Sequence, residues 1–346
     1  MRPSTPPIPP HDYEGIGSCM KAAWYERFGS AADVLTVGDL DDPEPGPGEV
    51  SVRMRASAVN PSDVKKRAGS FPNLLDDGYV IPHSDGAGVI EALGEGVSSH
   101  RIGDDVWVYQ AQYGRRFGTA AQLVTTGGER APLLPEGVSY EVGACLGIPV
   151  MTAHRCVFAD GPVEGQTLLI TGGPGRVGHY AIQWAHRAGA RVIATSCNEK
   201  DDRVCMEAGA DAIVSHREEN WSAKVLAVND GRPIDRVIEV EFGANLPEVL
   251  NVVRTGATIA TYSSTQDPLP KLPFYRMMYM DLRIRLVIVY AMPEEAKRHA
   301  IADIDEASRA GWLQHRVAHV VDLDEIAKAH ELIENGGFRG CVVVRP

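Results

Sequence analysis

The sequence predicts an α/β protein in which a β-rich domain precedes a doubly wound parallel sheet. From Lys21 to about Val124, short runs typical of β-strands, such as EVSVRMRASAVN and SDGAGVIEALG, alternate with turns rich in Gly and Pro. From about Gly143 onward, helical stretches alternate with apolar strands. Such alternation is typical of a parallel sheet with helices on both faces.

The clearest single element is a strand, glycine loop, helix and second strand within Leu168–Ser196. The apolar run Leu168–Ile170 is typical of a buried parallel strand, and Arg191–Thr195 predicts the second strand. Between them, apolar residues recur at helical spacing, and Gly189 is expected to end the helix. The loop has the G-x-G-x-x-G spacing, formed by Gly173, Gly175 and Gly178. A βαβ unit with this loop predicts a Rossmann fold that holds a dinucleotide pyrophosphate at the start of the helix.

The alternation continues through four more predicted strands, which are Ala212–Ser215, Asp235–Val240, Thr258–Tyr262 and Ile284–Tyr290. In the tail, RVAHVVDL predicts a strand, DEIAKAHELIENGG a helix and CVVVRP a final strand. Five prolines occur in the first ten residues, so residues 1–19 are expected to form a flexible extension.

Composition limits the classes of function. The 346 residues are enough for two ordinary domains, and a net charge of −12 argues against nucleic acid or an anionic membrane as the main partner. No apolar run reaches the length of a transmembrane helix, and no secretory signal is expected at the N-terminus. The six cysteines form no C-x-x-C pair, so reduced thiols in a cytoplasmic protein are the simplest interpretation.

Several motifs, in their order along the chain, resemble the medium-chain dehydrogenase/reductase superfamily and, within it, the zinc-independent quinone oxidoreductase (zeta-crystallin-like) branch. They are AVNPSDVKKRAG, IPHSDGAGVIEALGEGV, GIPVMTAHRCV, GADAIVSHREEN and AHELIENGGFRGCVVV. The resemblance implies a GroES-like catalytic domain at 20–143, a Rossmann cofactor-binding domain at 144–284 and a C-terminal return to the catalytic domain at 285–346. It also implies a homodimer, and the apolar run Arg285–Met292 is a candidate edge strand for pairing two copies.

The same resemblance predicts a metal-free site. Zinc-dependent members of the superfamily hold the metal with Cys, His and Cys, and at the positions aligned by motif this chain has Asn60, Ser84 and Ile148. None of these is a usual ligand of tetrahedral zinc. His83 and Asp85 are close in sequence, but two ligands in one loop do not make a site.

Without a metal, hydrogen bonds must polarise the substrate carbonyl. The resemblance implies that Asn60 lies at the substrate end of the cleft, where its amide donates; a loop amide in an Asx-type turn is an equally good interpretation. Asp63 is a candidate member of this network, although a structural helix cap is the favoured interpretation. Where many members carry tyrosines, this chain has Lys65 and Phe71, which leaves quinone specificity open. Lys65 is a candidate proton donor or anion-binding residue if burial keeps it near the site, while a solvated lysine is the more common situation.

The dinucleotide predicted for this site is NADPH. An NAD-specific site places Asp or Glu at the end of the second strand, where this chain has Ser196, so a 2′-phosphate meets no carboxylate there. Lys200 is a candidate partner for that phosphate, with a solvated helix lysine as the alternative, and the resemblance places His216 beside the adenosine phosphate. The other residues expected to contact the cofactor are Gly172, Gly173, Gly175, Arg176, Val177, Gly178 and Thr152.

Together these observations predict an NADPH-dependent, metal-free oxidoreductase that transfers hydride to a small molecule, either a quinone or an activated carbon–carbon double bond, as in an enone or enal. The alternatives within enzymes are a zinc-independent alcohol or aldehyde dehydrogenase and an enoyl-thioester reductase. A different class is a non-catalytic structural or RNA-binding role, and the acidic net charge argues against RNA as the main partner.

Overall fold

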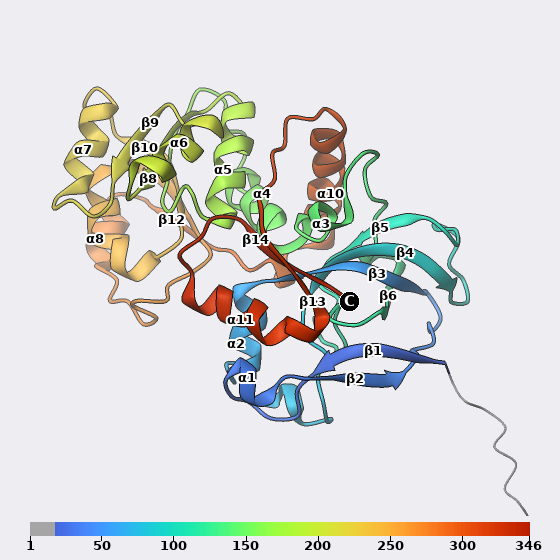
Figure 1. The fold of residues 1–346 in the computed structure, drawn as a ribbon. Coiled ribbons are helices and arrows are strands. Elements are labelled where there is room, and N and C mark those ends of the chain that lie inside the picture. Colours follow the sequence, from blue (N-terminus) through green and yellow to red (C-terminus); the bar gives the residue numbers. More distant parts are fainter. Residues whose placement is uncertain (1–17) are drawn as a thin grey trace, which may run out of the picture.

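The computed structural model describes residues 18–346, whose strands form two main sheets and one separate two-stranded pair (Figure 1). One main sheet is parallel and carries helices, and the other belongs to a β-rich unit, which confirms the α/β fold class with a doubly wound sheet and a GroES-like unit. Of the predicted extension, residues 1–17 lie outside the described part, and Cys19 already begins the first strand.

The β-rich unit is built around β3 (Glu49–Val59), an 11-residue strand. The first half of β3 pairs with β6 and its last residues with β14, while β4 follows its other edge. The strands of this unit before the tail are β1 (Cys19–Trp24), β2 (Thr36–Asp41), β3, β4 (Asp85–Leu93), β5 (Asp105–Val108) and β6 (Leu123–Gly127). The helical segments are α1 (Ala31–Val34), α2 (Pro61–Arg67), η1 (Pro72–Leu75), η2 (Gly128–Arg130), α3 (Tyr140–Gly143) and η3 (Leu146–Val150).

The cofactor sheet is parallel throughout and has the order β12-β11-β10-β7-β8-β9. Its strands are β7 (Thr167–Ile170), β8 (Arg191–Ser196), β9 (Ala212–Ser215), β10 (Ile234–Glu239), β11 (Val253–Thr261) and β12 (Arg283–Leu286). Its helices are α4 (Met151–Phe158), α5 (Arg176–Arg187), α6 (Glu199–Glu207), α7 (Trp221–Val228), α8 (Phe242–Val252) and α9 (Phe274–Tyr279). The chain winds outward from β7 to β9 and returns to β10 on the other side of β7, so the loops after β7 and β10 part at the edge where such sheets bind ligands.

The predicted strands of this sheet are confirmed, with differences at their ends: β11 begins at Val253, five residues before the predicted start at Thr258. Leu168–Ile170 is fully buried because β7 lies between β8 and β10 with helices on both faces. The predicted strand Ile284–Tyr290 is too long, since β12 ends at Leu286 and Val289–Ala291 forms the short helical turn η4. The chain leaves the sheet here because the Val289 carbonyl accepts a hydrogen bond of 2.7 Å from the Gln110 side chain of the β-rich unit.

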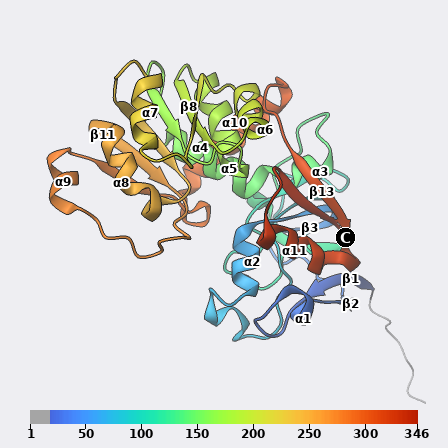
Figure 2. The same ribbon diagram turned by 60° about the vertical axis from the view of Figure 1, so that its left-hand side comes forward.

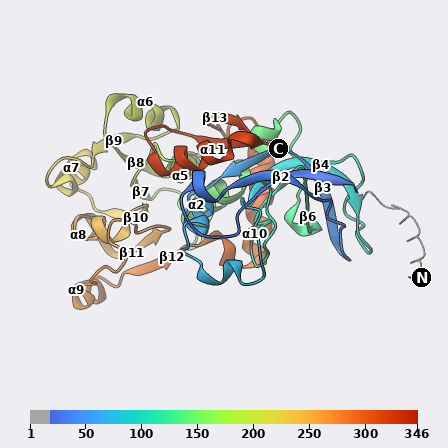
Figure 3. The same ribbon diagram turned by 60° about the horizontal axis from the view of Figure 1, so that its bottom comes forward.

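The tail joins both units. Helix α10 (Glu294–Arg309) packs on α4, where the His154 ring and the Asp303 carboxylate are 2.6 Å apart. Strands β13 (Val317–Asp322) and β14 (Cys341–Arg345) then extend the β-rich sheet, with η5 (Leu323–Glu325) and α11 (Ile326–Asn335) between them. The expected return to the catalytic domain at residue 285 therefore starts with η4 and is complete only at β13. Figure 2 and Figure 3 both show α11 beside α2.

Within residues 18–346, none of the helices has both the length and the apolar character required to cross a bilayer.

Candidate active site

The glycine loop connects the end of β7 to the start of α5. Gly172 has a φ of +62°, a conformation that L side chains rarely adopt. Its backbone N–H donates to the Thr195 hydroxyl over 3.0 Å, which ties the loop to the end of β8. Gly175 is the N-cap of α5, so the first N–H groups of that helix, which have no partner within the helix, follow directly.

The three glycines of the motif serve different purposes. A Cβ on Gly178 would lie 2.4 Å from the Gly172 carbonyl oxygen, so the close approach of α5 to its own loop requires glycine. A Cβ on Gly173 would lie 2.8 Å from Cys205 Sγ, so this glycine faces the protein core. A Cβ on Gly175 would have only the Gly172 oxygen within 4 Å, at 3.0 Å, and Gly175 alone of the three lines the cleft described next.

A cleft of about 320 Å³ lies between the two units beside this loop. Among the described residues its charged lining side chains are Arg176 and Arg339, and none of its lining residues there is a carboxylate. Arg176 reaches from α5 to the end of β3, where its guanidinium donates to the Val59 carbonyl over 3.4 Å. The other lining residues are Asn60, Pro61, Ile148, Pro149, Gly172, Gly175, Val177, Val240, Tyr262, Ile333, Gly336, Gly337, Phe338 and Gly340. An anionic ligand therefore suits this cleft.

The structure brings part of the predicted cofactor set to the cleft. Gly172, Gly175, Arg176 and Val177 line it. Gly173 and Gly178 support the loop from behind, and Thr152 is buried in α4 and is not one of the lining residues. Tyr262 and Arg339 line the cleft but were not predicted to do so. For Arg339 the available signal was its place in the glycine-flanked segment GGFRG, whereas Tyr262 carried no signal beyond ending a predicted strand.

Asp85 joins two of the three positions at which the zinc-dependent relatives carry metal ligands. Its Oδ2 accepts hydrogen bonds from Asn60 Nδ2 at 2.9 Å and from the Ile148 backbone N–H at 2.7 Å. Asp85 has no exposed surface, and burial raises the pKa of its carboxyl to about 7. Gly147 makes room for it, since a Cβ there would lie 2.3 Å from Asp85 Oδ1. The side chain therefore fixes the plane of the Asn60 amide at the cleft.

Asp63 caps helix α2. Its Oδ2 accepts from the Asn60 backbone N–H over 2.8 Å, one half of a capping box. Burial raises the pKa of this carboxyl to about 6, against the opposing influence of the Lys66 charge and of the cap hydrogen bond. The geometry agrees with the structural interpretation of Asp63, which acts on the site through the position of Asn60.

The lysine near the site is Lys66, not Lys65. Lys65 is exposed, so the burial on which its proposed role depended is absent. Lys66 is buried, and its ammonium donates to Ser84 Oγ at 3.3 Å, Gln112 Oε1 at 3.1 Å and the Tyr290 hydroxyl at 3.3 Å. Neighbouring helical residues differ by about 100° in direction. Packing of α2, which the sequence does not show, decided which lysine of the KKR run faces inward.

Phe71, the other departure from the family pattern, does not line the cleft. It is 45% exposed and borders a separate surface hollow with Arg115 and Arg116. Its replacement of a tyrosine therefore leaves the polar groups at Asn60 unchanged.

At the end of β8 the structure corrects the expected charge. The Ser196 hydroxyl donates to the carboxylate of Asp202, so a negative charge lies at the position where the sequence showed none. Arg339 forms a two-bond ion pair with Asp201, with 2.9 Å from Nε to Oδ1 and 2.7 Å from Nη2 to Oδ2. Lys200 is exposed on α6. His216 is also exposed, and its backbone N–H donates to the Ser196 carbonyl over 3.3 Å.

The side chains considered as metal ligands have other partners. His83 Nδ1 is 2.8 Å from Ser57 Oγ, and its Nε2 is 3.0 Å from His330 Nε2, while Asp85 is bound to Asn60 and Ile148. In the part of the chain that the structure describes, no cluster of three His, Cys, Asp or Glu side chains could hold a metal ion.

These residues fit a dinucleotide. The positive φ of Gly172, the contact that excludes a Cβ at Gly178 and the open side of Gly175 shape a loop that a phosphate can approach closely. The helix behind it has 12 residues, and its N-terminus carries Arg176. Residues of this chain thus provide backbone donors and cationic side chains for a pyrophosphate.

Two family models match the chain. The "Alcohol dehydrogenase GroES-like domain" matches residues 46–158, and "Zinc-binding dehydrogenase" matches residues 177–306. A quinone oxidoreductase from Sus scrofa is 29% identical over 327 residues, which cover 94% of this chain and 97% of the relative. Among solved structures, an NAD-dependent alcohol dehydrogenase has a TM-score of 0.84 at 28% identity, covering 94% of this chain and 100% of its own. A mycobacterial protein complexed with NADPH has a TM-score of 0.83 at 25% identity, with the same coverage.

The matched domains follow one another in the order of the two structural units, and the curated relative aligns along almost the whole chain. The cleft between the units has the glycine loop of a nicotinamide dinucleotide site. The chain is an NAD(P)-dependent oxidoreductase and belongs to the medium-chain dehydrogenase/reductase superfamily.

Proposed function

We propose that this protein is an NADPH-dependent, metal-free reductase of quinones or of carbon–carbon double bonds activated by a carbonyl group. The observation that carries the proposal is the cleft, which combines the glycine loop and two arginines with the amide of Asn60. The loop and the arginines suit a dinucleotide phosphate, and the amide suits a substrate carbonyl oxygen. The name of the Sus scrofa relative supports the quinone as substrate class.

Asn60 is proposed to polarise the substrate. Bound NADPH would supply a hydride from its dihydronicotinamide ring. One hydrogen of the Asn60 amide nitrogen is given to Asp85, so the second remains to donate to the substrate oxygen that gains charge during reduction. Asp85 touches no substrate in this scheme and acts as a positioning residue.

The proposal of a metal-free site is supported by the side chains at the three positions where zinc-dependent members of the superfamily carry metal ligands. Asn60 and Ser84 are neutral side chains bound to Asp85 and Lys66, and Ile148 contributes only a backbone N–H. Thiolate, imidazole and carboxylate are the usual donors to zinc, and these three positions provide none of them.

A panel of acceptors tests the function. Purified protein with NADPH should oxidise the cofactor when a quinone, enone or enal is added, and the rate should survive a chelator.

An alcohol dehydrogenase is the second candidate, because the chain is 28% identical to an NAD-dependent alcohol dehydrogenase. Oxidation of alcohols with NAD or NADP, together with no reduction of any panel member, would favour that candidate and overturn the reductase. If an enoyl thioester is the only compound that the protein reduces, the substrate class is narrowed to thioesters.

The cofactor preference is expected to respond to Asp202. The NADPH-bound relative and the basic groups Arg339 and Lys200 favour a 2′-phosphate, whereas the Asp202 carboxylate on Ser196 opposes it. Asp202→Asn should therefore raise the ratio of kcat/KM for NADPH over NADH. Removing a repulsion of about 1–2 kcal/mol near the protein surface corresponds to roughly tenfold.

The matched control for this prediction is Glu207→Gln, which neutralises an exposed carboxylate at the far end of the same helix. The control should leave the ratio at the wild-type value. An unchanged or lower ratio in Asp202→Asn would show that the 2′-phosphate does not lie beside Ser196, and preference of the wild type for NADH would remove NADPH from the proposal.

We also propose a homodimer that forms through β12. Among the described strands β12 and β9 are the two outer strands of the cofactor sheet, and beside β12 the side chains of Leu286 and Ile288 are 78% and 54% exposed. A second copy pairing with this edge would satisfy its free N–H and C=O groups and cover these side chains. Light scattering at micromolar concentration should give the mass of two chains, and a monomer mass would contradict the dimer. A cytoplasmic location stays a prediction.

A further inference from the structure

The ammonium group of Lys66 is a buried charge that the proposed function leaves unused. Lys66 is 5% exposed and donates its three hydrogen bonds to Ser84, Gln112 and Tyr290. All three acceptors are neutral, although a buried cation is usually paired with a carboxylate. Nζ also lies 4.9 Å from the centre of the Tyr290 ring. A lysine placed in this way gives up its proton more readily than an exposed lysine does.

Hydroxyl groups connect this ammonium to the cleft. The Tyr290 hydroxyl, which accepts from Lys66, is 3.2 Å from Ser62 Oγ. Ser62 is only partly buried and follows Asn60 and Pro61, both of which line the cleft. Ser62 and Lys66 are four residues apart and therefore lie on the same face of α2. The line from Lys66 through Tyr290 to Ser62 thus runs from the interior to the first turn of α2 at the cleft.

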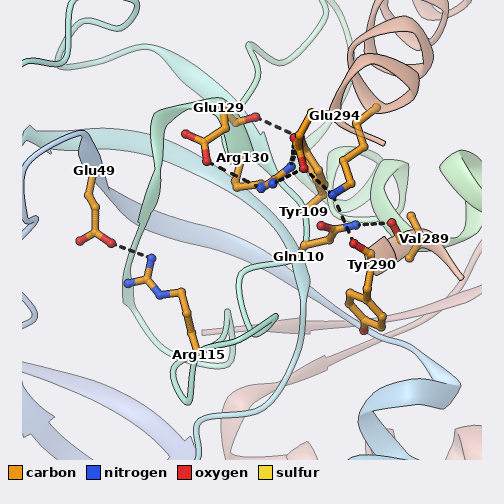
Figure 4. Close-up of polar contacts among 10 residues, drawn as sticks. Glu49, Tyr109, Gln110, Arg115, Glu129, Arg130, Val289, Tyr290 and Glu294 are labelled. Atoms are coloured by element: carbon orange, nitrogen blue, oxygen red, sulfur yellow. Dashed lines mark hydrogen bonds and ion pairs between the residues drawn. The ribbon is translucent and has the colours of Figure 1, made fainter. Parts of the chain in front are cut away.

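Contacts on its backbone hold Tyr290 in this position (Figure 4). Gln110 donates to the Val289 carbonyl over 2.7 Å, and Lys297 donates to the Tyr290 carbonyl over 3.3 Å. Lys297 in turn is 2.8 Å from Glu294. Figure 4 shows the Tyr290 ring pointing away from these contacts. The backbone is therefore fixed by groups separate from those that the hydroxyl contacts.

We propose that Lys66 is the proton source of the reduction and that the hydroxyl groups of Tyr290 and Ser62 carry its proton to the substrate oxygen. This inference rests on the proposed function. The acceptor gains a hydride from the cofactor and one proton on the oxygen that became negative. Ser62 gives that proton and regains one from Tyr290, and Tyr290 regains one from Lys66. The neutral amine of Lys66 then takes a proton from water, so one hydride and one proton are consumed in each turnover.

The charges around Lys66 determine the expected pH dependence. The titratable groups that face it are Asp63 on α2, His83 just before β4, Asp85 at the start of β4, and Tyr290 on η4. Burial lowers the pKa of Lys66 below its usual 10.5, while the two carboxylates act in the opposite direction. A neutral amine has no proton to give. Activity should therefore be lost as pH rises through this lowered pKa.

The deciding comparison is between Lys66→Arg, Lys66→Met and Lys65→Met. Arginine keeps the positive charge but does not release a proton in this pH range. General acid catalysis contributes on the order of 10²–10⁴ in rate, so kcat of both Lys66 variants should fall by at least about tenfold. The wild type should show an alkaline fall in kcat that both Lys66 variants lack. Lys65→Met, at the exposed neighbour, should lose much less and keep the alkaline fall.

Two further measurements separate this role from a structural one. The dissociation constant of NADPH should stay close to the wild-type value in Lys66→Arg, because the cofactor loop is untouched. In protein labelled at the lysine Cε, one NMR signal should titrate below the others and be missing from Lys66→Arg.

The proposal is overturned if the alkaline fall persists in Lys66→Arg, since the titrating group would then be Asp63 or Asp85. Equal losses in Lys65→Met and Lys66→Met would also overturn it, as would the absence of a lysine signal with a lowered pKa. Failure of the wild type to reduce any acceptor in the panel would overturn the proposed function and the proton route together.

Discussion

Gly175→Val is expected to abolish dinucleotide binding while the protein stays folded. Gly175 has a φ of −66°, which valine adopts without strain, and the only atom within 4 Å of an added Cβ is the Gly172 oxygen at 3.0 Å. The rest of the side chain would occupy the space at the helix N-terminus that a pyrophosphate needs. NADPH affinity should fall by at least about hundredfold, or ~2.8 kcal/mol. Fluorescence titration measures the loss, and circular dichroism checks the fold.

Gly178→Ala is the matched comparison. We expect it to lower the stability of the fold while leaving open the space that a pyrophosphate needs. Here the added Cβ lies 2.4 Å from the Gly172 carbonyl oxygen, so the helix or the loop must move. Overpacking of this kind costs about 1–3 kcal/mol, which unfolding in urea would detect. Wild-type affinity for NADPH in Gly175→Val would remove the glycine loop from the cofactor site, although the Rossmann fold would stand.

Asp85→Ala is expected to reduce both stability and activity. It removes the acceptor of two donors, the buried Asn60 Nδ2 and the partly buried Ile148 N–H. Each donor left unpaired costs about 1–3 kcal/mol, so the free energy of unfolding should fall by roughly 2–5 kcal/mol. The Asn60 amide also loses the bond that orients it toward the cleft, so kcat should fall by more than NADPH affinity. Asp85→Asn, which keeps one acceptor oxygen, should retain more of both properties, and equal effects of the two variants would contradict this role.

The pH dependence of Asp85→Asn provides a second test. Burial raises the pKa of Asp85 to about 7 in the folded state, against about 3.9 for an unperturbed carboxyl. Between these values the folded protein binds a proton that the unfolded chain has lost, so ionisation of Asp85 lowers wild-type stability as pH rises from about 4 to 7. Asparagine does not ionise. The free energy of unfolding of the variant, relative to the wild type, should therefore rise by about 2–4 kcal/mol across this window.

The comparison uses the difference between variant and wild type because buried histidines act in the opposite direction. Burial lowers the pKa of His83 and of His179 to about 3. The contribution of these two histidines to the free energy of unfolding therefore increases as pH rises from about 3 to 6.5. Both proteins contain these histidines, and their contribution cancels in the difference. A difference that is flat with pH would show that the Asp85 carboxyl ionises at its ordinary pKa.

The elements defined by local patterns were the ones that the sequence predicted well. Leu168–Ile170, the glycine loop and the helix ended by Gly189 each carry their signal within a few residues. The C-terminal limit of β12 was missed because the chain leaves that sheet to meet Gln110, a contact between residues far apart in the sequence. Similarly, the sequence shows six cysteines without a paired motif, yet Cys145 and Cys341 lie in the same buried cluster of the core.

The site residues divide in the same way. From sequence alone came the parallel sheet and the loop that lines the cleft at Gly175, because local pattern specifies them, while the family resemblance of the motifs implied that Asn60 lies at the cleft, which it lines. Only the tertiary structure decided that Lys66 rather than Lys65 turns inward and that Asp202 brings a negative charge to Ser196. The same is true of Asp85, which joins Asn60 to Ile148. Each of these outcomes depends on which face of a helix or strand is buried against a distant part of the chain, and a pattern of neighbouring residues carries no record of that contact.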